Sequence, residues 1–130
     1  MNGDKEKEKI GMFREYLEEY LGNKALQKYE WKIFREKVPQ WQENYMEKLN
    51  QEYIALLSGE GSASDRFWEI YKRQKTDKRC IGVQIEMNKS KMVYDILSFI
   101  RKGIITVNDL DGFSENLQKI ITDYMEDSWN

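Results

Sequence analysis

The sequence contains no histidine, one cysteine and one proline in 130 residues. Zinc sites of the usual kinds need several Cys and His ligands, and Ser-His or Cys-His catalysis needs an imidazole, so these classes of site are excluded. The single thiol, Cys80, cannot form an internal disulfide, which is typical of proteins in a reducing cytoplasm. We therefore expect a cytoplasmic protein that is not an enzyme and that holds no metal and no cofactor.

Long apolar runs and turn-forming residues are also scarce. No apolar run approaches the roughly 20 residues that a membrane-spanning helix needs, and residues 1–9 lack the apolar run of a signal peptide. Eight glycines and one proline are too few for the many turns of an all-β fold. With 34% charged and 13% aromatic residues, the composition is typical of helices that have one apolar and one charged face. The sequence predicts an all-α single domain over residues 1–130, with mobile ends at 1–8 and 127–130.

Apolar residues recur at helical spacing in about six segments. The first three predicted helices cover residues 4–21, 24–37 and 40–57, and Val38-Pro39 separates the last two because a residue before proline is pushed out of helical dihedrals. A glycine-rich connector, 58–62, predicts a flexible joint. Ser62 and Asp65 then form a capping pair for a fourth helix, which contains the basic stretch 66–79.

The last two helices are predicted within residues 88–125, joined by a turn at Gly103. Glycine ends the first of them in the left-handed conformation, and Thr106 and Asp109 are spaced for a reciprocal capping box. The run Gly-Ile-Ile-Thr-x-x-Asp-Leu that starts at Gly103 resembles the turn of the helical hairpins called SHOCT domains. That resemblance covers residues 92–121 and implies hairpin geometry but no activity.

Residues 81–87 depart from helical spacing. Ile81, Val83, Ile85 and Met87 alternate with polar residues or glycine, which is the pattern of an extended, half-buried segment. One interpretation is an extended loop that lies over the core. The other is an exposed edge that pairs with a second copy or another protein, so a homodimer through 81–87 is also predicted.

Charge is distributed unevenly along the chain. Ten basic and four acidic residues lie between Arg66 and Lys102, a net charge of +6, whereas six acids and one lysine from Asp109 onward give −5. The basic cluster can bind nucleic-acid phosphates or an acidic protein surface. Alternatively, the basic and acidic faces neutralise each other across the fold or are simply solvated. The candidate residues of this basic patch are Arg66, Lys72, Arg73, Lys75, Lys78 and Arg79.

Aromatic residues are more numerous than a core of this size needs. Four Trp and eight Tyr predict that some are exposed, and exposed aromatics next to arginine are typical of interface hot spots. Trp68 and Tyr71 lie beside the basic stretch, and the acidic last helix offers a second surface. The additional candidate partner-binding residues are Trp68, Tyr71, Asp123, Glu126 and Asp127.

Together these features favour a small helical protein that acts by binding a protein partner. The whole chain resembles small uncharacterised helical proteins of low-GC bacteria and their mobile elements, which implies a role for a phage or mobile element. The concrete hypothesis is a phage or mobile-element inhibitor of a host nucleic-acid-binding defence protein, similar to anti-CRISPR proteins. In that hypothesis the acidic helix 113–126 occupies a basic groove of the partner and the basic patch meets an acidic one. The alternative is a nucleic-acid-binding regulator that uses the basic 66–79 helix.

Overall fold

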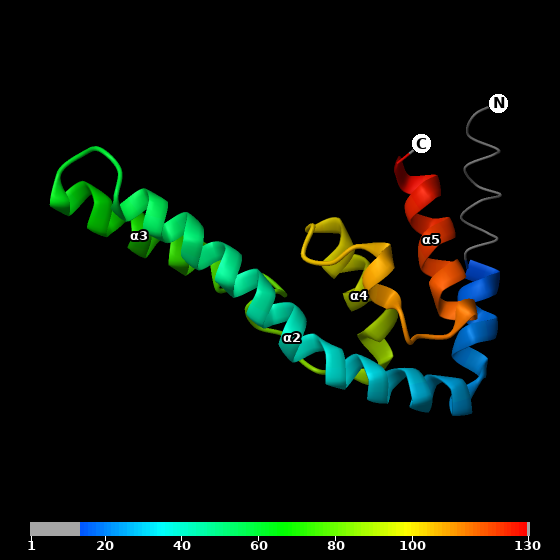
Figure 1. Ribbon diagram of the computed structural model, residues 1–130. Helices are drawn as coiled ribbons and strands as arrows, with labels where there is room; N and C mark the ends of the chain where they lie inside the picture. The colour runs from blue at the N-terminus through cyan, green and yellow to red at the C-terminus, as the bar shows by residue number, and fades with distance from the viewer. Residues whose placement is uncertain (1–13, 130) are drawn as a thin grey trace.

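The computed structural model describes residues 14–129, with side chains described as far as residue 126. After a helix over residues 14–22 come α2 (Lys24–Leu57), α3 (Ala63–Asp77), α4 (Met92–Arg101) and α5 (Glu115–Trp129), with short 3-10 turns at Lys89–Lys91 and Val107–Leu110 (Figure 1). The predicted all-α single domain is confirmed. There are five helices and no strand within residues 14–129, rather than about six helices.

The prediction that Val38-Pro39 separates two helices was wrong, because α2 runs unbroken through Pro39. Phe34, Val38 and Trp41 are buried at helical spacing on both sides of the proline. Pro39 and Arg35 are exposed, so the Arg35 carbonyl that loses its amide partner at Pro39 can be hydrated. Continuous burial on the opposite face thus outweighs the cost of an interior proline, and α2 bends along its length (Figure 1).

The hydrophobic core lies between the N-terminal half of α2, the helix 14–22, α4 and α5. The apolar stripes predicted for the last two helices supply most of it, and α3 supplies none. Its members are Leu17, Tyr20, Phe34, Val38, Trp41, Met92, Val93, Ile96, Leu97, Phe99, Ile105, Leu110, Phe113, Leu117, Ile120, Ile121 and Met125.

Trp41 is the aromatic centre of this core. Its ring lies 5.3 Å from that of Phe99, 6.1 Å from that of Phe34 and 6.5 Å from that of Phe113, measured between centroids. These contacts join α2 to α4 and to the residues that precede α5. Trp41 therefore links three parts of the chain that are distant in sequence.

One charged side chain, Glu30, is completely buried in this core. Its carboxylate accepts a hydrogen bond from the backbone N–H of Ser114, at 3.0 Å to Oε1, just before the start of α5. Ser114 in turn accepts a hydrogen bond from the backbone N–H of Leu117. A negative charge is stabilised at the N-terminus of a helix. Glu30 therefore holds the start of α5 against α2.

The turn between α4 and α5 has the predicted geometry. Gly103 has a φ of +71°, and Thr106 and Asp109 form the reciprocal capping box, with the Thr106 N–H donating to Asp109 Oδ2 at 2.7 Å. The capped element is the 3-10 turn Val107–Leu110. The hairpin follows from local signals in the sequence.

Residues 81–87 form a loop over the core, as the first interpretation predicted, with a turn at 81–83 and no strand. The N–H groups of Val83 and Gln84 both donate to the Cys80 carbonyl, and Ile81 and Ile85 pack against the core. A β carbon on Gly82 would lie 2.3 Å from Cδ1 of Tyr45, so only glycine fits at this position without displacing the ring. The alternating pattern therefore reflects a loop that lies against the core. The homodimer through 81–87 stays a prediction.

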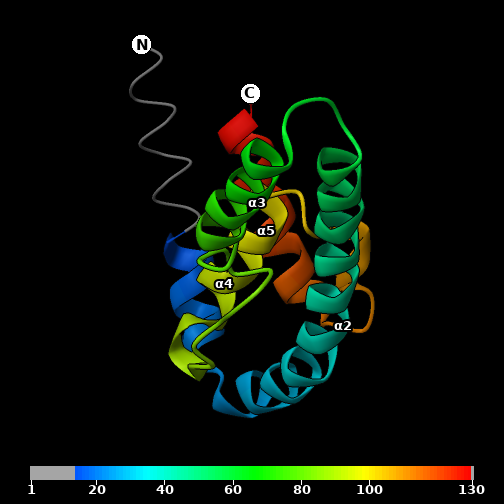
Figure 2. The same ribbon diagram turned by 90° about the vertical axis from the view of Figure 1, so that its left-hand side faces the viewer.

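The second half of α2 and α3 form an antiparallel hairpin that projects from the core, called here the arm. Figure 1 shows the arm on the opposite side of the molecule from α5, and Figure 2 shows its two helices side by side. The predicted joint, 58–62, is the turn at its tip, where Gly61 has a φ of +110° and Ser62 Oγ accepts from the N–H of Asp65. No residue of α3 is buried, so the arm displays α3 to solvent.

Candidate partner-binding surface

The face of α3 that meets α2 is mostly polar. Arg66, Ile70, Arg73 and Asp77, spaced by three or four residues, are its partly buried positions, and only Ile70 is apolar. Arg66 donates to the Leu57 carbonyl at 2.6 Å. The inner face therefore holds the arm together largely through polar contacts, and the apolar residues of α3 lie elsewhere.

Arg73 is the centre of the polar contacts at the foot of the arm. It lies 3.6 Å from Glu52 and 3.5 Å from Asp77, and its guanidinium lies 5.4 Å from the centroid of the Tyr53 ring. The Tyr53 hydroxyl donates to Asp77 Oδ2 at 2.5 Å. Desolvation, and then this hydrogen bond, raise the pKa of Tyr53 to about 12. Arg66 and Arg73, two members of the predicted basic patch, are thus engaged within the arm.

The pKa of Tyr53 predicts that the arm loses stability at high pH. The ordinary pKa of tyrosine is 10.0, so the folded protein keeps this proton longer than the unfolded chain. The stabilisation is present below pH 10 and is lost as the pH rises towards 12. Urea unfolding at pH 8 and at pH 11, followed by circular dichroism, should show a lower midpoint at pH 11. Tyr53→Phe should make that drop smaller, and an unchanged drop would contradict the assignment.

Three aromatic side chains lie exposed on the outer face of α3. Phe67, Trp68 and Tyr71 are 62%, 61% and 53% exposed. They contact one another edge to face, with ring centroids 5.2 Å apart for Phe67 and Trp68 and 5.8 Å apart for Trp68 and Tyr71. These residues are called here the aromatic cluster. Because isolated exposed apolar residues are ordinary but contiguous ones mark interaction sites, the cluster is the main candidate site of the arm.

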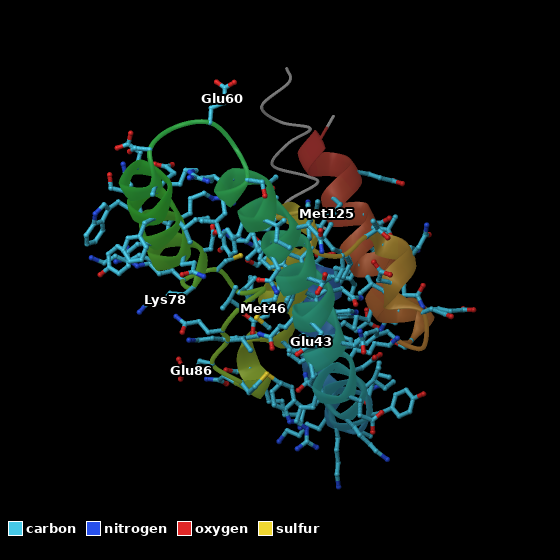
Figure 3. The ribbon with its side chains drawn as sticks, turned by 60° about the vertical axis from the view of Figure 1, so that its left-hand side comes forward. Glu43, Met46, Glu60, Lys78, Glu86 and Met125 are labelled. Carbon is cyan, nitrogen blue, oxygen red and sulfur yellow. The ribbon has the colours of Figure 1, made fainter. Side chains whose placement is uncertain are left out.

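Exposed cations lie beside the aromatic cluster, together with two exposed acids, Asp65 and Glu69. Lys72, Lys75, Lys78 and Arg79 are all exposed, and the Lys75 ammonium lies 5.9 Å from the centroid of the Tyr71 ring. Figure 3 places Lys78 at the foot of α3 and Glu60 at the tip of the arm. The outer face of α3 therefore combines aromatic rings with cations, and four of the six predicted basic-patch residues contribute to this region.

The acidic candidates lie at the other side of the molecule. Asp123 is partly buried and Glu126 is exposed on α5, while the Asp127 side chain lies outside the part of the structure that is described. Since α3 and α5 are on opposite sides (Figure 1), the predicted acidic residues do not share a surface with the basic patch, and the two charged helices do not neutralise each other by direct contact.

Sequence reasoning did not include Phe67 among the candidate residues. No local signal in the sequence identifies it, because the apolar face of a helix normally packs inward and a polar stripe such as Arg66, Arg73 and Asp77 normally faces solvent. In the folded protein that stripe is partly buried against α2, and Phe67, Trp68 and Tyr71 lie exposed together.

Other chemistry is not evident in the described part of the chain. Within residues 14–129 no three acidic or sulfur side chains are grouped so that they can hold a metal ion. No helix in this range has the length and apolar character needed to cross a bilayer. Comparisons with protein-family models, curated proteins and solved structures find no match to the chain.

Proposed function

We propose that this protein is a non-enzymatic binding protein that docks on another protein through the outer face of α3. The observation that carries the proposal is the aromatic cluster, three adjacent rings each more than half exposed on a helix with no buried residue. Aromatic residues on a helix that projects from a packed body are suited to fill a pocket of a partner. Two or three such anchors typically provide most of the affinity of an interface.

The charge around the cluster indicates the chemistry of the partner. Lys72, Lys75, Lys78 and Arg79 have no acidic partner among the described residues. A complementary surface therefore has an apolar pocket for Trp68 with carboxylates at its rim. Such charges chiefly increase the association rate and fix the orientation of the partners.

An inhibitor of a host nucleic-acid-binding defence protein is the concrete form of this proposal. Such a protein acts by occupying a surface and needs no catalytic residues of its own. The shape of the arm favours an inhibitor of this kind, because the arm projects from the core and can enter a groove of the target. The acidic α5, on the opposite side, provides a second surface for a basic region of the same target.

The experiment that tests the proposal is site-specific photo-cross-linking in the host cell. Trp68→benzoylphenylalanine should give one cross-linked product of defined mass, which excess unmodified protein abolishes. Tyr29→benzoylphenylalanine is the matched control, because Tyr29 is equally exposed but lies on α2 away from the arm. A product obtained equally from both positions, or only from position 29, would contradict the proposal.

The alternative is that the outer face of α3 binds nucleic acid. Lys72 and Lys75 are exposed on α3, Lys78 and Arg79 are exposed in the turn directly after it, since the helix predicted over 66–79 ends at Asp77, and a base can stack on Trp68 or Tyr71. A salt titration of binding to random single-stranded and duplex DNA separates the two functions. Binding that weakens steeply with salt and is lost when Lys72, Lys75, Lys78 and Arg79 are replaced by Gln favours nucleic acid. Absence of binding at low salt removes this alternative.

A further inference from the structure

A pocket on the core, away from the arm, is lined by cations and tyrosines. It lies between the helix 14–22, α4 and α5 and has a volume of about 650 Å³. Leu17 and Leu97, both buried core residues, form part of its lining. The volume is within the range of roughly 300–1,000 Å³ that is typical of small-molecule sites.

Three cations line this pocket, and no carboxylate does so among the residues that the structure describes. They are Arg14, Arg101 and Lys102. Arg101 lies with its guanidinium 5.0 Å from the centroid of the Tyr124 ring and donates to the Tyr124 hydroxyl, which holds the side chain in place. Among the residues that the structure describes, Arg14 and Lys102 have no side-chain partner. An anion in the pocket would therefore meet three positive groups, one of them already held in place.

An exposed aromatic ring also lines the pocket. Tyr94 is 58% exposed although it belongs to the most apolar helix of the core, and it contacts no other ring within the described residues. Its ring can stack on a planar group of a ligand, while the Ser98 hydroxyl, one turn along α4, offers a hydrogen bond. The lining thus pairs an anion-binding side with an aromatic side.

We propose that this pocket binds a nucleotide unit, with the phosphate at Arg14, Arg101 and Lys102 and the base on Tyr94. Arginine is the residue best suited to bind phosphate oxygens in pairs, and the exposed tyrosine provides the stacking surface. The unit is either a free nucleotide or the phosphorylated end of a strand, which share this chemistry. The site is separate from the outer face of α3, so it does not depend on the function proposed above.

Calorimetric titration of the full chain with AMP tests this site. A dissociation constant of about 10 µM to 1 mM is expected for a ligand of this size in an open pocket. Adenosine, which lacks the phosphate, and ribose 5-phosphate, which lacks the base, should each bind at least about 10-fold more weakly. A 5′-phosphorylated oligonucleotide that binds more tightly than both AMP and the same strand without its 5′-phosphate assigns the site to strand ends, and one that binds more weakly than AMP assigns it to free nucleotides.

Variants locate the binding in this pocket. Arg101→Gln and Arg14→Gln, both at exposed positions, should each weaken AMP binding by about 10-fold or more. Tyr94→Ser should lower the affinity for AMP but leave the affinity for ribose 5-phosphate unchanged. The double control Lys28→Gln with Lys48→Gln, at exposed positions of α2 outside the pocket lining, should have no effect. No binding at about 5 mM AMP, ribose 5-phosphate binding as tightly as AMP, or an equal loss in the α2 control would overturn the proposal.

Discussion

Replacing Trp68 and Tyr71 together with Ala should lower the affinity for the cross-linked partner by at least about 100-fold while leaving the fold intact. Each aromatic anchor of an interface typically contributes about 2 kcal/mol or more, which is a factor of about 30 in the dissociation constant. Both side chains are more than half exposed and none of α3 is buried, so their removal should change the free energy of unfolding by less than about 0.5 kcal/mol. Surface plasmon resonance with the purified partner measures the first quantity and urea unfolding the second.

Two control variants sharpen this experiment. Ile54→Ala removes an exposed apolar side chain from the other helix of the arm, and Tyr29→Ala removes an exposed ring from α2 near the core. Both should bind the partner within about 3-fold of the unchanged protein, because interface residues outside the hot spot contribute little. Equal losses in all three variants would mean that the partner does not distinguish the outer face of α3.

Trp41→Ala, unlike the substitutions on α3, should cause a large loss of stability. Trp41 is only 7% exposed and contacts the rings of Phe34, Phe99 and Phe113. Truncating a buried Trp typically costs about 3–5 kcal/mol, and folded domains have only about 5–15 kcal/mol of stability. Thermal unfolding followed by circular dichroism should show a drop in the melting temperature of roughly 10–20 °C.

Trp68→Ala is the matched control, since it removes the same side chain from the arm. Its melting temperature should lie within about 2 °C of the unchanged protein. The pair also distinguishes core from surface tryptophans, which the sequence pattern did not do. If Trp41→Ala and Trp68→Ala lowered the melting temperature equally, the aromatic cluster would be part of the stabilising core and not a free surface.

The elements that the sequence predicted correctly are those specified by local chemistry. Gly103 and the Thr106–Asp109 capping box gave the hairpin of α4 and α5 because each depends on residues within one or two turns. The apolar stripes at helical spacing likewise predicted most of the core. The helix break predicted at Val38-Pro39 does not occur, because Val38 and Trp41 pack against residues distant in sequence and keep the helix continuous. Such contacts are not visible in a local pattern.

The candidate surface was predicted in composition but not in geometry. The sequence identified Trp68, Tyr71 and the basic patch, but it did not show that Arg66 and Arg73 turn towards α2 and make contacts there. That orientation depends on the antiparallel pairing of α3 with the second half of α2. Nor did it show the pocket lined by Arg14, Tyr94 and Arg101, because these residues come from segments about 80 residues apart.

Hydrogen–deuterium exchange of the whole chain, with and without the cross-linked partner, is the most direct test of the function proposed here. The backbone amides of residues 62–79 should exchange more slowly in the complex, because binding covers α3 and suppresses its local opening. The amides of α4 should exchange at the same rate in both states. Slower exchange confined to α4, α5 or the 81–87 loop, with α3 unchanged, would contradict the account.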